Sequence, residues 1–156
     1  MTYQIKGLEA DQFRRYFAMS AEELAANSIC IHTADDSVPG LPCRVSLNDA
    51  PAGERMILLN HHHLPVETPY SSSHAIYVSE GSVTNSFTNE IPPSLKIRLL
   101  SVRAFGKDDM MVNADVIEGE NVEGLITDFM QDPKVSYVHV HYARPGCFAA
   151  RVERAE

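Results

Sequence analysis

The sequence predicts an α+β protein that is mostly antiparallel sheet or a partly closed barrel. Three observations support this class: several segments alternate apolar and polar residues with a period of two, turn-forming residues separate these segments, and one segment near 121–131 has helical periodicity. The chain has 156 residues, of which 44% are apolar, so it can bury a core. We expect residues 1–156 to form a single domain.

The N-terminal part predicts a short strand over 3–5 and two short helices. An apolar stripe at helical spacing marks the first helix in the residues Phe13, Tyr16 and Phe17. Ser20, followed three residues later by Glu23, forms the capping-box pattern, in which both side chains satisfy free N–H groups at a helix start. This pattern predicts the second helix over 21–26.

The middle of the chain predicts a series of strands. From their period of two, the expected strands are 29–32, 43–47, 55–63, 75–78, 95–105 and 111–117. Pro65 and Pro69 end the pairing after 63, because proline cannot donate a backbone hydrogen bond. The alternation fails at Leu99-Leu100, which predicts a β-bulge. The turn at 106–109 predicts a hairpin.

The last third predicts a helix and then a second hairpin. The apolar stripe of the helix consists of Val122, Leu125, Ile126, Phe129 and Met130. Asn121 is placed to cap it, and the residue before Pro133 ends it because that residue is pushed out of the helical region. The final hairpin pairs 135–142 with 147–153.

The composition of the chain limits which kinds of binding partner and which cellular compartment we expect. The chain has 13 Lys and Arg residues against 21 Asp and Glu, a formal charge of −8 that repels a phosphate backbone, so we expect no nucleic-acid partner. Apolar runs are far shorter than the roughly 20 residues that cross a bilayer, and the first residues do not resemble a secretion signal. Three cysteines at wide spacing do not resemble a disulfide framework. We therefore expect a cytoplasmic protein without a membrane partner, and a homodimer is compatible with these features.

Two histidine pairs share the spacing of one strand face. His61 and His63 are two residues apart, as are His139 and His141, and side chains at that spacing point the same way with Cβ atoms roughly 6–7 Å apart. Imidazoles in this arrangement suit a divalent metal such as zinc, which takes about three protein ligands in a catalytic site. Glu67 is a further candidate ligand.

The parity of the final hairpin predicts where its histidines point. The apolar positions of the last strand are Phe148, Ala150 and Val152. With a loop of two or four residues, His139 and His141 share the face of these positions, and Cys147 points to the opposite face. A nearby imidazole can make a cysteine nucleophilic, but this parity disfavours Cys147 as a nucleophile. The inward histidines are either a core network or the wall of a polar cavity.

Three separated motifs carry a family resemblance. They are Cys43-Arg44-Val45-Ser46-Leu47, the block Pro69-Tyr70 through His74-Ala75-Ile76-Tyr77-Val78, and Val138-His139-Val140-His141 continuing to Pro145-Gly146-Cys147-Phe148. With these motifs the chain resembles the bacterial family filed as domain of unknown function 1203, over nearly its whole length. The resemblance implies a complete single-domain member and brings no reaction, substrate or cofactor. It directs attention to His74 ahead of His61 and His62, and it also places Arg103 and Cys147 in matching motifs.

Two functional hypotheses follow. The first is a protein that binds a small polar or anionic ligand in a pocket lined by His63, His74, Arg103, His139 and His141. Within that set, a metal ion would be held by His63, His139 and His141. The alternative is an interaction or structural domain without enzymatic activity, in which the same histidines form a buried network. The sequence identifies no catalytic residue, reaction or cofactor.

Overall fold

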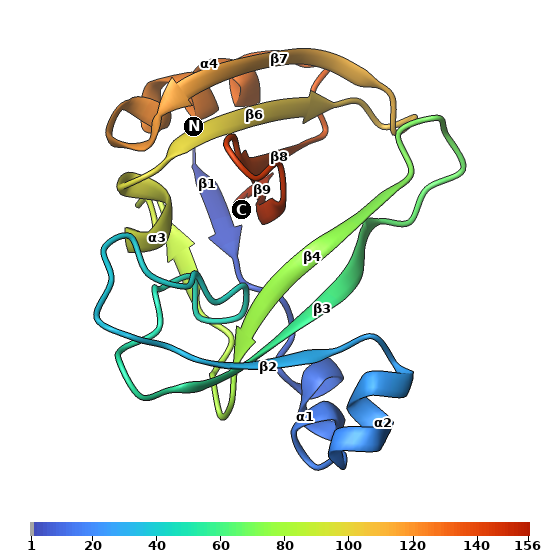
Figure 1. The fold of residues 1–156 in the computed structure, drawn as a ribbon. Coiled ribbons are helices and arrows are strands. Elements are labelled where there is room, and N and C mark those ends of the chain that lie inside the picture. Colours follow the sequence, from blue (N-terminus) through green and yellow to red (C-terminus); the bar gives the residue numbers. More distant parts are fainter. Residues whose placement is uncertain (1) are drawn as a thin grey trace.

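The computed structural model describes residues 2–156 and contains two antiparallel sheets (Figure 1). The strands are β1 (Tyr3–Lys6), β2 (Cys30–Thr33), β3 (Arg55–Leu64), β4 (Ser72–Ser79), β5 (Ser86–Thr88), β6 (Leu99–Phe105), β7 (Met111–Glu118), β8 (Tyr137–Tyr142) and β9 (Phe148–Arg154). The larger sheet has the order β5-β1-β9-β8-β6-β7, and the smaller one has the order β2-β3-β4. Across residues 2–156 both sheets stay open, so the α+β prediction is confirmed in its open-sheet form and not as a barrel.

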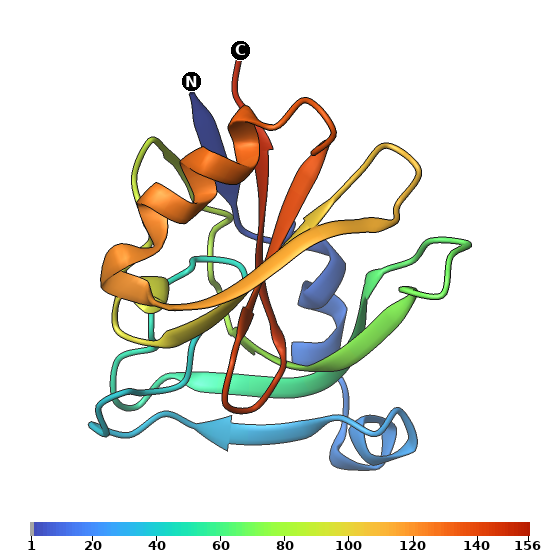
Figure 2. The same cartoon turned by 90° about the horizontal axis from the view of Figure 1, so that it is seen from above.

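The helices divide between the two sheets. They are α1 (Asp11–Phe17), α2 (Ala21–Ala26), α3 (Pro93–Lys96) and α4 (Val122–Gln131), with a 3-10 turn η1 (Gly119–Asn121) before α4. Figure 1 shows α1 and α2 beside the smaller sheet and α4 against the larger one, and Figure 2 shows the two chain ends side by side where β1 pairs with β9. No helix of the described chain is long and apolar enough to cross a membrane.

Each sheet builds its own apolar core. The larger sheet and α4 enclose Val138, Val140 and Ile126, all fully buried. The smaller sheet packs against Phe13 of α1 and Leu24 of α2. The capping box of α2 is present as predicted, because Ser20 Oγ accepts from Glu23 N at 3.2 Å and Glu23 Oε1 accepts from Ser20 N at 3.4 Å.

The predicted strand over 43–47 is wrong, because these residues form a tight turn. Leu47 N donates to Cys43 O at 3.0 Å, and Leu47 has a φ of 60°. Val45 and Leu47 are nevertheless fully buried. Because the turn lies against the core, its apolar side chains reproduce the alternation of a strand. The backbone of the turn lies close to Gly7, because a side chain at that position would collide with the carbonyl oxygen of Val45.

The predicted strand over 95–105 is too long, and its expected bulge is absent. Pro93 occupies the first turn of α3, where its missing N–H costs nothing, and β6 begins only at Leu99. Register is regular from Leu99 to Ala104 and shifts between Ala104 and Phe105. The break in alternation at Leu99 is therefore the change from helix to strand.

Two smaller features also differ from the prediction. The strand β5 lies in a polar segment for which the sequence predicted no strand, and it pairs with β1. Asn121 is the N-cap residue of α4 but makes no side-chain capping bond, because η1 precedes the helix. The α4 bounds agree with the prediction within one residue.

Candidate metal centre

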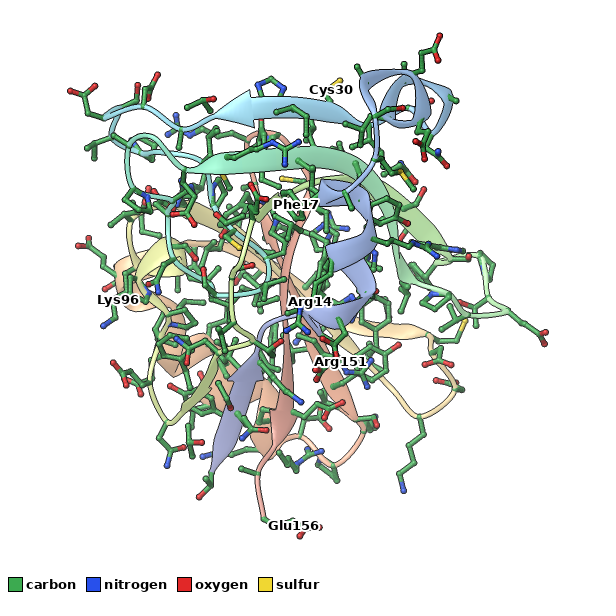
Figure 3. The ribbon with its side chains drawn as sticks, turned by 90° about the horizontal axis from the view of Figure 1, so that it is seen from below. Arg14, Phe17, Cys30, Lys96, Arg151 and Glu156 are labelled. Atoms are coloured by element: carbon green, nitrogen blue, oxygen red, sulfur yellow. The ribbon has the colours of Figure 1, made fainter. Side chains whose placement is uncertain are left out.

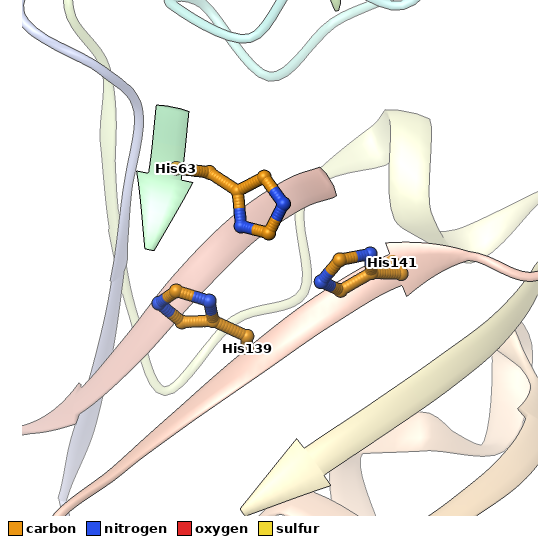
Figure 4. A group of neighbouring side chains, drawn as sticks. All are labelled: His63, His139 and His141. Carbon is orange, nitrogen blue, oxygen red and sulfur yellow. The ribbon is translucent and has the colours of Figure 1, made fainter. Parts of the chain in front are cut away.

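Three histidines from both sheets meet at one point. His139 and His141 lie two residues apart on β8 and are 1% and 3% exposed, so both face the interior as predicted. His63 comes from the end of β3 in the smaller sheet, where the β3–β4 register shifts between His61 and Leu64. Figure 4 shows the three imidazoles turned toward one another.

The spacing of the three rings suits a single ion. One nitrogen from each of His63, His139 and His141 lies within 4.8 Å of the other two. Even at that upper limit, their common centre lies about 2.8 Å from each nitrogen, roughly 0.7 Å beyond a zinc–imidazole bond of about 2.1 Å. Small ring movements would bring all three nitrogens to bonding distance.

The hydrogen bonds of the three rings leave lone pairs for a ligand. His141 Nδ1 lies 3.0 Å from the carbonyl oxygen of Gly146, so it carries the proton and leaves Nε2 without one. His63 Nε2 lies 3.4 Å from Ser72 Oγ. Within residues 2–156, the Nδ1 atoms of His63 and His139 are the buried side-chain polar atoms that lack a partner. A buried polar atom without a partner costs about 1–3 kcal/mol, and a metal ion would satisfy both atoms.

Burial keeps the three imidazoles neutral at physiological pH. Desolvation is the largest cause in each case, and it lowers the pKa of His139 to about 3 and that of His141 to about 4. The pKa of His63 is also lowered to about 4, by desolvation first and then by the neighbouring charges of His61 and Arg103. Metal ions bind only the neutral form of imidazole, so the ligands are in the required state.

Arg103 supplies a positive charge beside the cluster. It pairs with His139 across β6 and β8, and its Nε donates to Ser101 Oγ at 3.2 Å. Burial lowers its pKa from the usual range, but an arginine retains its charge in proteins. In the described part of the chain Arg103 belongs to no ion pair, and the histidine cluster contains no carboxylate.

Phe148 forms an apolar wall shared by all three rings. Its ring centroid lies 5.0 Å from those of His63 and His139 and 5.9 Å from that of His141. The sequence marked this residue as an apolar strand position on the face of His139 and His141, but not as a member of the site. Its place in the register of the hairpin, opposite His141, is the signal that could have identified it.

The predicted register of the last hairpin is only partly right. His141 pairs with Phe148 as expected, but His139 pairs with Arg151 and not with the apolar positions Ala150 and Val152. The reason is a register shift between Val140 and His141, which inserts an extra residue into β9. Cys147 points away from the histidines, as the parity predicted, and its Sγ accepts a hydrogen bond from Arg44 Nη2 at 2.9 Å.

The remaining predicted residues lie outside the cluster. His74 lines a separate cavity of about 590 Å³, and its Nδ1 lies 3.2 Å from the carbonyl oxygen of Ala75. His61 packs edge-on against Phe13, with ring centroids 5.9 Å apart. His62 and Glu67 are exposed. The structure thus places Arg103 beside the three clustered histidines His63, His139 and His141. His74 lies on the wall of the cavity and is not in the cluster, but it is near enough for its charge to lower the pKa of His63 and His141.

This arrangement has a defined chemical capacity. Three neutral imidazoles can hold a divalent transition metal and leave one coordination position open. A metal ion with an open position can polarise a bound water or oxyanion. Arg103, as a half-buried cation without a carboxylate partner, would favour an anion at that position.

Comparison with known proteins yields one family. The family described as "Protein of unknown function (DUF1203)" matches over residues 40–154, a range that contains the three clustered histidines, Arg103 and Phe148. No curated protein and no solved structure matches the chain. Because the match covers well over half of its length, the chain belongs to the family described as Protein of unknown function (DUF1203).

Proposed function

We propose that this protein binds one divalent transition-metal ion through His63, His139 and His141. The observation that carries the proposal is the convergence of three imidazoles, with one nitrogen of each within 4.8 Å of the other two, together with buried Nδ1 atoms on His63 and His139 that lack a hydrogen-bond partner. A buried network evolved only for packing would be expected to pair these atoms with each other or with the backbone.

The hydrogen bond from His141 to Gly146 also supports a metal. Imidazoles that bind metals usually donate their other N–H to a carbonyl or carboxylate, which fixes the tautomer and the ring orientation. Gly146 O, 3.0 Å from His141 Nδ1, is such a partner. It leaves Nε2 of His141 as the binding atom.

The ligand at the open position would be a small anion held by Arg103. A divalent ion bound by three neutral histidines keeps its full double charge, and Arg103 adds a further positive charge. A water-derived hydroxide or a small oxyanion would be stabilised by both. The proposed function is therefore metal-dependent binding of a small anion.

Titration of the metal-free chain with Co²⁺ tests the proposal. Cobalt bound by three histidines and one further ligand absorbs in the visible range, so binding and geometry are read together. We expect one Co²⁺ per chain, displaced by Zn²⁺. His139→Phe and His141→Phe should each weaken binding roughly a hundredfold or more, since even partners of metal ligands are worth 10- to 100-fold.

His62→Ala is the matched control. This histidine is exposed, lies next to His63 in the sequence and is 3.0 Å from Ser71 Oγ, but it is not in the cluster. Its variant should bind Co²⁺ as the unmodified chain does. Equal binding by His139→Phe and the unmodified chain would contradict the proposal and favour a network that serves only packing.

A further inference from the structure

A second site lies between the two sheets, beside the turn that joins β8 and β9. It is a cavity of about 590 Å³, within the range typical of small-molecule sites. Apolar side chains such as Leu58 and Leu99 form much of its wall, while Arg144 and Pro145 are exposed at its mouth. The clustered histidines do not line it, so it is distinct from the proposed metal site.

Two guanidinium groups share one aromatic ring on the wall of this cavity. The Cζ atoms of Arg44 and Arg98 lie 4.9 and 5.1 Å from the ring centroid of Tyr142. Arg98 is neutralised by Asp49 in a two-pronged ion pair, with Nη1–Oδ1 at 2.7 Å and Nη2–Oδ2 at 3.0 Å. Only one carboxylate therefore serves two adjacent cations.

Arg44 is the cation without a carboxylate. It is 1% exposed, and its donors bind Phe148 O at 2.8 Å, Pro42 O at 2.6 Å and Cys147 Sγ at 2.9 Å. No ion pair of the described chain includes it. These neutral acceptors bind its N–H groups but do not neutralise its positive charge. A buried charge without a counter-ion lowers the stability of the fold.

Tyr142 does not supply the missing negative charge. Burial is the largest influence on its hydroxyl and raises its pKa, although the two arginines oppose this shift. The hydroxyl donates to Ser94 Oγ at 3.2 Å, as a protonated phenol does. Tyr142 therefore leaves the charge of Arg44 without a counter-ion among the neighbours that the structure describes.

The mouth of the cavity adds one more cation and one acid. Arg144 is exposed and belongs to no ion pair in residues 2–156, and Glu118 is the acidic side chain of the lining. With Asp49 counted behind Arg98, three arginines face two carboxylates. One net positive charge in an apolar cavity matches a ligand with one negative charge and an apolar body.

We propose that this cavity binds a small organic monoanion, with its carboxylate at Arg144 and its apolar part against Leu58 and Leu99. A carboxylate fits the planar fork of a free guanidinium with two parallel hydrogen bonds. Arg44 contributes mainly through its charge, because each of its three nitrogens already donates one hydrogen bond within the protein. A dianion such as a phosphate monoester would exceed the available positive charge and meet Glu118.

Cys147 offers a built-in reporter, because it lines the cavity. Cys30 is exposed on the edge strand β2 (Figure 3), so it serves as a reference in the same chain. The native chain, in the presence of a chelator, is alkylated with iodoacetate or with iodoacetamide, and the modification of each cysteine is measured by mass spectrometry. At one cysteine, the intrinsic reactivity of the thiol affects the rates of both reagents. The ratio of the iodoacetate rate to the iodoacetamide rate therefore reports how strongly the surroundings of that cysteine favour an anion.

We expect the iodoacetate-to-iodoacetamide ratio to be roughly three- to tenfold higher at Cys147 than at Cys30. Benzoate should slow the alkylation of Cys147 by iodoacetamide, whereas benzamide, its neutral counterpart of equal shape, should not. Arg144→Gln should lower the ratio at Cys147 and weaken protection by benzoate. Arg14→Gln, which removes the same charge from α1 outside the cavity (Figure 3), should change neither.

Three results would overturn the proposal. They are equal ratios at the two cysteines, equal protection by benzoate and benzamide, and no alkylation of Cys147 in the native chain. Stronger protection by phenyl phosphate than by benzoate would contradict the choice of a monoanion. Because the chelator removes metal, each outcome is independent of the proposed metal site.

Discussion

The ring of Phe148 lies parallel to the imidazole of His63, with 5.0 Å between the ring centroids and 3° between the planes. The two residues belong to different sheets, so this stack joins the smaller sheet to the larger one at the proposed metal site. The contact excludes water from one side of His63. It also holds the ring in the orientation that Figure 4 shows, facing His139 and His141.

Replacement of Phe148 by leucine should weaken metal binding. Phe148→Leu removes the flat surface on which His63 rests. Part of the free energy of metal binding is then used to order that ring. We expect the affinity for Co²⁺ to fall roughly tenfold, as for other groups that orient metal ligands. Titration of the purified variant by visible absorption measures this change.

Phe129→Leu provides the control for a general loss of packing. Phe129 lies on α4, is 6% exposed and belongs to the core of the larger sheet. Its replacement should lower the free energy of unfolding by about 1–3 kcal/mol, as for other losses of core volume, without changing the affinity for Co²⁺. Equal affinities of the two variants would show that stacking on His63 does not orient a ligand.

The stability of the metal-free chain should fall as the pH falls from about 6.5 to 4. The pKa values of His63, His139 and His141 lie below the unfolded value of 6.5, so the folded chain binds fewer protons than the unfolded chain in this window. Their contribution is complete above pH 6.5 and is lost on acidification. For His139 alone, the loss between pH 6.5 and 4.5 is about 2–3 kcal/mol.

Urea unfolding across this pH range, with a chelator present, measures the effect. Carboxylates also titrate in acid, so the unmodified chain is compared with His139→Phe. The free energy of unfolding of this variant should fall less steeply with decreasing pH. His62→Ala should retain the steeper dependence. Identical slopes for His139→Phe and the unmodified chain would mean that His139 is not a buried neutral imidazole.

Arg103→Gln should affect the metal and its anion in opposite directions. Loss of the nearby cation removes repulsion of the ion, so the affinity for Co²⁺ should rise roughly three- to tenfold. Azide binding to the cobalt form should weaken by a similar factor, because the anion loses its guanidinium partner. Arg103→Lys keeps the charge and should restore both properties in part. Parallel changes in the metal and azide affinities would argue against this role for Arg103.

The ion pair between Arg98 and Asp49 should stabilise the fold far more than surface pairs do. Their side chains are only 12% and 22% exposed, and Asp49 Oδ2 also accepts from Gly40 N at 2.9 Å. Asp49→Asn should lower the free energy of unfolding by about 2–3 kcal/mol, because it leaves a poorly solvated cation. Asp11→Asn breaks the pair with Arg14, whose side chains are 83% and 73% exposed, and should cost less than about 1 kcal/mol. Similar losses in both variants would show that burial of Arg98 has little effect.

Elements whose sequence patterns involve only neighbouring residues could be predicted from the sequence. The stripe of α4, the capping box at Ser20 and the strand that ends at Tyr142 each depend on neighbours along the chain, and the structure confirms all three. The same local rule placed His139 and His141 on one inward face. Two of the three members of the proposed metal site could therefore be oriented before any coordinates were known.

Features that depend on tertiary contacts were not predictable in this way. The turn at Cys43–Leu47 resembles a strand in sequence because the core buries its side chains whatever their backbone conformation. The register shift in β9 leaves no mark in the alternation of its residues. His63 could be suggested as a ligand, but nothing local placed it opposite β8, because in residues 2–156 no strand of one sheet pairs with a strand of the other. His74, from a matching motif, lies on the wall of the other cavity for the same reason.

Elemental analysis of the chain after loading tests the central claim most directly. The tag-free protein is incubated with an excess of Zn²⁺, passed through a desalting column and measured by plasma mass spectrometry beside His139→Phe and His62→Ala. We predict one zinc ion per chain in the unmodified protein and in His62→Ala, and loss of that ion in His139→Phe. A metal content near zero in the unmodified chain, or one that His139→Phe leaves unchanged, would contradict a metal site at His63, His139 and His141.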